Sequence, residues 1–141
     1  MRVAVAGANA DALCRAAGVA AATFATPRLA AGRRWALLAL TRGAASQPAP
    51  ALRAQCLLLP GSSSPALARY AAQAVGYGFS PRDTLTLSSV RGTRLLCLQR
   101  SVVTLGGAIL EPQELPLPDA LAALPNEDAM LAALLRLLCD S

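Results

Sequence analysis

The polar side chains best suited to binding or chemistry gather in a few short segments of the chain. One is a run of serines, Ser62, Ser63 and Ser64, which follows an apolar stretch and precedes Pro65. Serine followed by proline is typical of a helix start, where free backbone amides and hydroxyls can hold an anion. Ordinary capping by Ser64 explains the same residues, so the run predicts either a cap or an anion site.

Two further polar segments lie between residues 77 and 100. Residues 77–83 combine aromatic, hydroxyl and acidic side chains with glycine and proline, a composition typical of a turn. Residues 99–100 end an apolar stretch. These side chains suit a polar ligand or partner, or hydrogen bonds across neighbouring strands. The candidate ligand-binding residues are therefore Ser62, Ser63, Ser64, Tyr77, Ser80, Asp83, Gln99 and Arg100.

The chain contains neither histidine nor lysine, and this removes most of the usual catalytic side chains. A serine or cysteine nucleophile has no histidine as its base. Schiff-base chemistry and the phosphate-binding P-loop both need a lysine. Arginine, carboxylates and thiols remain, so an enzyme is not excluded. We assign no catalytic residue and favour a protein without catalytic activity.

Neither the cysteines nor the acidic residues are spaced as metal ligands. The four cysteines lie far apart in the sequence, and none forms the CxxC pair typical of a zinc site. Cys56 and Cys97 lie inside apolar runs, where cysteine usually packs as a small hydrophobic residue. Glu111 and Glu114 are close, but in an extended segment they point to opposite faces. We therefore expect no metal and no cofactor.

The charge of the chain favours an anionic partner. Thirteen arginines against eight acidic residues give a formal net charge of +5. The arginines are scattered along the sequence and only 4% of the residues are aromatic, so there is no basic tract and little on which bases could stack. This argues against nucleic acid and leaves a protein or a small anionic ligand as the expected partner.

Length and composition predict one folded domain. The chain has 141 residues, of which 55% are hydrophobic and 15% charged, enough for a core of its own. No apolar stretch reaches the roughly 18 residues that cross a membrane. Asp11 and Arg15 interrupt the apolar N-terminal stretch, unlike in a signal peptide. We expect a cytoplasmic protein that does not enter the membrane.

Up to residue 80, apolar runs and turn residues predict alternating strands and helices. The continuous apolar runs 35–41 and 55–59 are typical of strands covered on both faces. A helix over 10–17 is expected to be capped by Asn9 and ended by Gly18. A second helix is expected over 65–73, and a loop over 42–53. The weaker strands expected here are 2–6, 19–25 and 74–77.

After residue 80 the pattern changes to antiparallel strands. Residues 83–90 alternate apolar and polar side chains, and Arg91-Gly92 turns the chain into a strand over 94–100. Gly106-Gly107 predicts a hairpin with a type I′ turn. The prolines of 111–118 suit only an edge or a connector. A helix begins at Asn126 and packs on the sheet, so we predict a single α/β domain with a mixed sheet.

Residues 57–98 resemble the back half of a Mur ligase central domain. The resemblance is carried by an apolar strand ending in Leu59-Pro60, a helical segment over 66–74, Tyr77-Gly78-Phe79-Ser80 and Asp83. It implies ligase ancestry, but the phosphate loop, the modified lysine and the metal-binding histidine of that family are absent here. Residues 77–114 also resemble small bacterial proteins of spore-forming and gut Firmicutes, which implies no activity.

Three functions fit these observations. The first is a non-catalytic binding or regulatory module that meets its ligand through the candidate residues above. The second is an enzyme, Mur-ligase-like or carboxylate-based, acting on a nucleotide or phosphate compound. The third is a homo-oligomer subunit whose C-terminal helix packs against a copy of itself, because residues 130–138 are apolar around much of the helix.

Overall fold

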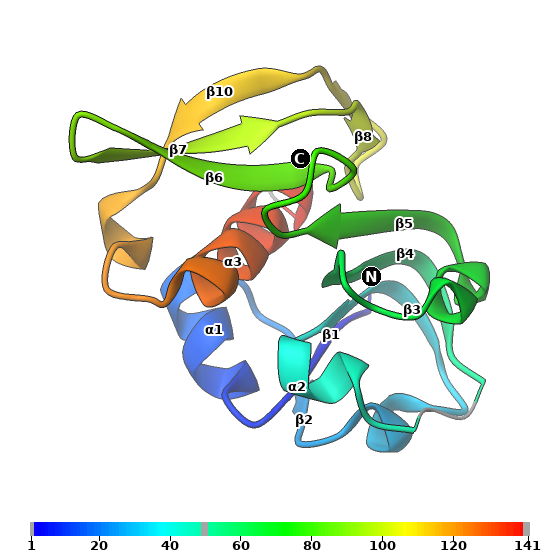
Figure 1. Ribbon diagram of the computed structural model, residues 1–141. Coiled ribbons are helices and arrows are strands. Elements are labelled where there is room, and N and C mark those ends of the chain that lie inside the picture. The colour runs from blue at the N-terminus through cyan, green and yellow to red at the C-terminus, as the bar shows by residue number, and fades with distance from the viewer. Residues whose placement is uncertain (1, 49–50, 140–141) are drawn as a thin grey trace.

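A mixed sheet of eight strands forms the centre of the computed structural model, which describes residues 2–48 and 51–139 (Figure 1). The strand order is β10-β7-β6-β5-β4-β3-β1-β2. Neighbours from β2 to β6 run parallel, while β6, β7 and β10 run antiparallel. These strands are β1 (Val3–Ala6), β2 (Ala22–Phe24), β3 (Arg34–Leu40), β4 (Arg53–Pro60), β5 (Ala71–Tyr77), β6 (Leu85–Val90), β7 (Thr93–Leu98) and β10 (Gln113–Pro116).

This arrangement confirms the expected α/β fold, parallel before residue 80 and antiparallel after it. The apolar runs become β3 and β4, whose residues are buried on both faces of the sheet. The proline-containing segment becomes β10, which pairs only with β7 at the edge of the sheet. The continuous apolar runs therefore predicted the central strands, and the prolines of residues 111–118 predicted a segment at the edge.

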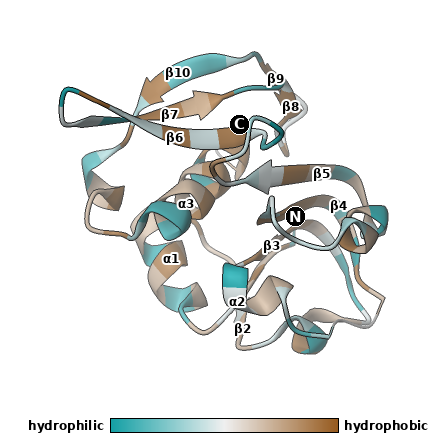
Figure 2. Cartoon of the chain, viewed as in Figure 1, coloured by the Kyte–Doolittle hydropathy of each residue, from teal (hydrophilic) through white to brown (hydrophobic). Residues whose placement is uncertain are grey.

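Two helices cover one face of the sheet, α1 (Ala10–Ala17) and α3 (Asn126–Cys139). They lie against each other, and α3 runs below β6 in Figure 1. Figure 2 shows hydrophobic residues along the helices and strands, while the start of α2 and the first turn of α3 are hydrophilic. The other face is covered by shorter pieces: α2 (Arg42–Ala45) and the 3-10 helices η1 (Pro27–Ala30) and η2 (Pro65–Tyr70). A third 3-10 helix, η3 (Asp119–Leu121), precedes α3.

The C-terminal helix buries its apolar residues inside its own chain. Every residue from Ala129 to Leu135 is buried, as is Leu138. The backbone N–H of Leu105 donates to the carbonyl of Leu138, so the small hairpin of β8 (Val102–Val103) and β9 (Ile109–Leu110) covers the end of the helix. The apolar residues around α3, which suggested that the helix packs against a copy of itself, are thus covered within one chain. They are therefore no reason to expect an oligomer.

The segment expected as a helix over 65–73 is different in the structure. It is a 3-10 helix that ends at Tyr70, and the chain enters β5 at Ala71. Pairing explains the early end: Ala71 and Gln73 lie opposite Ala54 and Cys56 of β4. Strand pairing with β4 overrides the weak helical preference of this alanine-rich stretch. The start is as expected, because the Ser64 hydroxyl accepts from the Ala66 N–H at 3.3 Å.

Three local expectations are also corrected. The expected loop 42–53 begins with the short helix α2, and its residues 49–50 lie outside the described residues. Asn9 precedes α1, but its side chain makes no capping hydrogen bond. Of Gly106 and Gly107 only Gly107 has a positive φ, so the hairpin exists but its turn is not type I′.

No helix within residues 2–48 and 51–139 is long and apolar enough to cross a membrane.

Candidate functional site

The carboxyl ends of β1, β3, β4 and β5 meet along one edge of the sheet, which we call the carboxyl edge. The strand order 2-1-3-4-5 reverses between β1 and β3. In open α/β sheets, ligands bind outside the carboxyl ends of the strands near such a reversal. The loops after β4 and β5 contain five of the eight candidate residues, and Tyr77 is the last residue of β5.

The reversal point itself is filled by a side chain. Thr41 follows β3 and lies against Gly7, which follows β1, so closely that a Cβ on Gly7 would overlap the threonine side chain. The Thr41 hydroxyl accepts from the Ala44 N–H at 3.3 Å and so begins α2. The glycine after the first strand therefore serves packing, and the open space lies farther along the edge.

Two adjoining hollows open there, beside the loops after β3, β4 and β5. One has a volume of about 400 Å³ and the other about 800 Å³. They share Arg42, Pro60 and Ser62. The smaller hollow also takes in Tyr77, Ser80 and Asp83, and the larger takes in Ser63 and Ser64. The structure thus brings six of the expected site residues together.

The serine loop has one unsatisfied polar atom. Ser64 caps η2, and Ser62 is exposed and faces both hollows. The Ser63 hydroxyl is buried and has no hydrogen-bond partner among the described residues. Since η2 is a 3-10 helix of six residues, the loop lacks the α-helix dipole on which the expected anion site relied. Any anion there must be held by side chains and single amides.

Asp83 is built into the floor of the smaller hollow. Its residue is only 4% exposed, and its carboxylate accepts from the Ser80 N–H at 2.9 Å. Three glycines surround that carboxylate: a Cβ on Gly61 would overlap it, one on Gly78 would lie 2.6 Å away, and one on Gly76 3.4 Å. The glycines therefore let the loops after β4 and β5 close around Asp83.

Gln99 and Arg100 do not line either hollow. The Gln99 amide donates to the carbonyls of Asp83 at 2.6 Å and Ser80 at 3.4 Å. The Arg100 guanidinium donates to the carbonyl of Arg82. Both side chains reach from the end of β7 and hold the backbone of residues 80–83, so the structure gives them a positioning role.

Tyr77 is a neutral hydrogen-bond donor in the folded protein. Its hydroxyl donates to the Leu40 carbonyl at 2.8 Å and joins β5 to β3 across β4. Burial, and secondarily the carboxylates of Glu127 and Asp128, raises the pKa of Tyr77 well above its ordinary value. It is therefore a structural contact of the site and not a base.

The residues that α3 brings to this edge were not among the candidates predicted from the sequence. Glu127 lines the smaller hollow and forms an ion pair with Arg42, with 3.2 Å between Oε1 and Nη1. The Asn9 amide donates to the Asp128 carboxylate at 3.2 Å, which replaces the expected cap. A usable signal was present: Glu127 and Asp128 occupy the first turn of a helix that had to pack on the sheet.

The remaining chemistry of this edge is modest. Among the described residues, no three histidine, cysteine, aspartate or glutamate side chains gather as metal ligands. Burial raises the pKa of Cys14 and of Cys56, so both thiols are protonated at neutral pH. What the two hollows offer is the exposed Arg42 guanidinium, hydroxyls and backbone amides, which suit recognition of an anion.

Comparison with known proteins assigns the chain to no family. The resemblance of residues 57–98 to a Mur ligase central domain stays a hypothesis, because no family model, no curated protein and no solved structure matches the chain.

Proposed function

We propose that this protein is a non-catalytic binding module that takes a small anionic ligand at its carboxyl edge. The ligand lies between the Arg42 guanidinium and the serine loop. The observation that carries the proposal is the position of Arg42, which is common to both hollows and whose side chain is 73% exposed. A guanidinium presents a planar set of donors that matches carboxylate and phosphate oxygens.

The unsatisfied Ser63 hydroxyl supports the same position. A buried polar group without a partner costs free energy, about 1–3 kcal/mol in proteins. Its loop also borders the larger hollow, so a modest loop shift can offer that hydroxyl to a ligand oxygen.

The loops after β4 and β5, which border the proposed ligand position, are already held in place by contacts within the chain. Asp83 holds Gly61 and Gly78 together, and Gln99 and Arg100 hold residues 80–83. A preorganised site loses less entropy on binding than a mobile one. The candidate residues from β5 to β7 thus contribute by shaping the edge.

Titration with inorganic phosphate, followed by ¹⁵N–¹H NMR, tests the proposal. The backbone amides of Ser62, Ser63 and Ser64 should shift in a saturable way. Arg42→Gln should weaken binding about tenfold, as expected for loss of a charge-assisted hydrogen bond. Glu127→Gln is the matched control: it breaks the same ion pair but keeps the guanidinium, so affinity should hold or rise.

Three outcomes oppose the proposal. Serine-loop amides that do not shift at high phosphate concentration, or equal affinity in Arg42→Gln and the wild type, would overturn it. Turnover of ATP or a UDP-sugar by the purified chain would replace it with the enzyme alternative. Both compounds belong in a thermal-shift panel run beside the NMR titration.

A further inference from the structure

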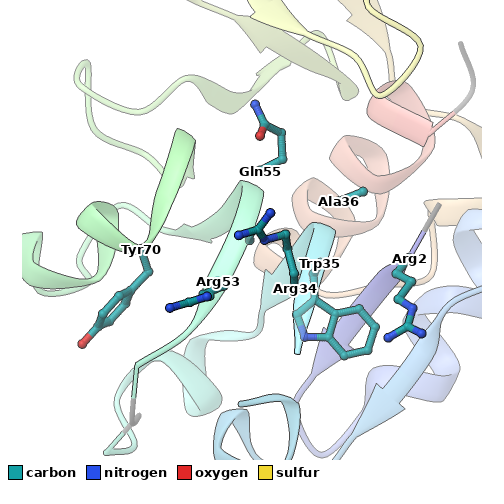
Figure 3. A pocket seen from close by; sticks show the side chains of 8 residues that line it. Arg2, Arg34, Trp35, Ala36, Arg53, Gln55 and Tyr70 are labelled. Carbon is teal, nitrogen blue, oxygen red and sulfur yellow. The ribbon is translucent and has the colours of Figure 1, made fainter. Parts of the chain in front are cut away.

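A separate hollow lies at the opposite edge of the sheet, where β1, β3 and β4 begin. Its volume is about 450 Å³, within the range usual for small-ligand pockets. Three arginines line it, Arg2, Arg34 and Arg53. Figure 3 shows their guanidinium groups around the indole of Trp35, with Arg2 on one side and Arg34 and Arg53 on the other. We call this group the arginine pocket.

Strand pairing brings these distant residues together. Arg34 and Arg53 are direct partners in the register of β3 and β4, and adjacent strands lie about 4.8 Å apart. The carbonyl of Arg2 accepts from the N–H groups of Ala36 at 2.8 Å and Leu37 at 3.3 Å, which fixes the start of β1 beside β3. The arginines that look scattered in the sequence therefore share one edge, because each stands at or just before the start of a parallel strand.

The arginine pocket lacks negative charge among the described residues. None of its lining residues is acidic, and the ion pair found within residues 2–48 and 51–139 joins Arg42 to Glu127 at the other edge. No side-chain hydrogen bond ties the guanidinium of Arg2, Arg34 or Arg53 to another described residue. Like charges on directly paired strand residues repel each other, so a bound anion would relieve a standing repulsion.

We propose that Arg2, Arg34 and Arg53 form a binding site for the diphosphate group of a small molecule. Guanidinium groups bind phosphate oxygens in pairs of parallel hydrogen bonds. Several of them around one hollow match a ligand with several charged oxygens better than a single carboxylate. The exposed amide of Gln55 and the Tyr70 side chain complete the wall. This site is independent of the carboxyl edge.

Trp35 provides a local reporter for the test. It is the one tryptophan of the chain, it lines the arginine pocket, and it is 3% exposed, with its indole N–H donating to the Ala30 carbonyl at 2.9 Å. Inorganic pyrophosphate, added without divalent metal at about 0.15 M ionic strength so that charges outside the pocket are screened, should change Trp35 fluorescence in a saturable way. Isothermal titration calorimetry gives the same affinity independently.

Matched glutamine variants assign the effect to the pocket. Arg34→Gln and Arg53→Gln should each weaken pyrophosphate binding about tenfold or more. Arg33→Gln removes the same charge from the neighbouring residue, which does not line the pocket, and should change affinity less than about twofold. Arg42→Gln should leave the fluorescence titration unchanged, so failure here is distinguishable from failure at the carboxyl edge.

The proposal would be overturned by a wild-type chain that does not respond to pyrophosphate, by an equal loss of affinity in Arg33→Gln, or by an unchanged titration in both pocket variants. A single-stranded oligonucleotide that binds more tightly than pyrophosphate, and is weakened equally by Arg33→Gln, would also overturn it in favour of a diffuse nucleic-acid surface. Thermal unfolding of the unliganded pocket variants should match the wild type or exceed it, since removing one charge relieves repulsion.

Discussion

The Asp83 carboxylate occupies the space that a side chain on Gly61 would need. The two residues come from the loops after neighbouring parallel strands, and their contact closes the floor of the smaller hollow at the carboxyl edge. Because Asp83 is buried and also bonded to the Ser80 N–H, it cannot move aside without losing that hydrogen bond. The absence of a Cβ at residue 61 is thus a condition for this arrangement.

Gly61→Ala should therefore destabilise the fold. Overpacking of a buried contact costs up to about 3 kcal/mol, and we expect a loss near that limit in urea unfolding. Gly43→Ala is the control, because a Cβ there meets nothing within 4 Å and the residue lies in α2. Alanine in that helix should leave stability unchanged or raise it by about 0.5 kcal/mol. Equal stability of the two variants would refute the Asp83–Gly61 packing.

Gln99→Ala should loosen residues 80–83. The Gln99 amide donates to the carbonyl of Asp83, and loss of this partly buried hydrogen bond should cost about 1–2 kcal/mol. Hydrogen exchange of the amides at 82–84 should quicken. Gln113→Ala, at an exposed residue whose side-chain amide donates to the nearby Glu111 carbonyl, should change stability by less than about 0.5 kcal/mol. If Gln99→Ala matched that control, the positioning role of Gln99 would be wrong.

Because of the raised pKa of Tyr77, we expect the folded chain to lose stability at alkaline pH. This pKa is raised in the folded chain, so above pH 10 the unfolded chain releases the phenol proton first. The free energy of unfolding then falls as pH rises, by up to about 1.4 kcal/mol per pH unit. Tyr77→Phe should be less stable than the wild type at pH 7, because the Leu40 carbonyl loses its donor. It should lose less stability between pH 10 and 11; parallel curves for both chains would show that Tyr77 does not cause the slope.

The sequence predicted the fold well because its apolar runs are long and unambiguous. The runs that became β3 and β4 need no tertiary information, and neither does the helix ended by Gly18 in a left-handed conformation. The start of β5 was missed because alanine suits a helix better than a strand, and only pairing with β4 extends the chain there. Prediction from local residue preference is therefore wrong where pairing with a neighbouring strand determines the backbone conformation.

The candidate site was predicted in part. Serine and glycine turns after buried strands correctly located the carboxyl-edge loops. Glu127 was visible in the sequence as an acidic residue in the first turn of a helix, but its place beside Arg42 depends on how α3 packs on the sheet. The arginine pocket had a signal: Arg2, Arg34 and Arg53 each mark the start of a parallel strand and so share one edge. That signal lies in the topology and not in spacing along the sequence.

The turn between β6 and β7 offers a route to a more stable chain. Arg91 and Gly92 form a two-residue hairpin loop, with φ values of +52° and +79°. Both positive values are typical of a type I′ turn, where asparagine followed by glycine is preferred. Arginine in this conformation costs roughly 1 kcal/mol because its Cβ crowds the backbone. Arg91→Asn should recover about 0.5–1 kcal/mol in thermal unfolding. Arg91→Ala keeps the Cβ and removes the same charge, so its stability should stay near the wild type; an equal gain in both variants would instead assign the effect to charge.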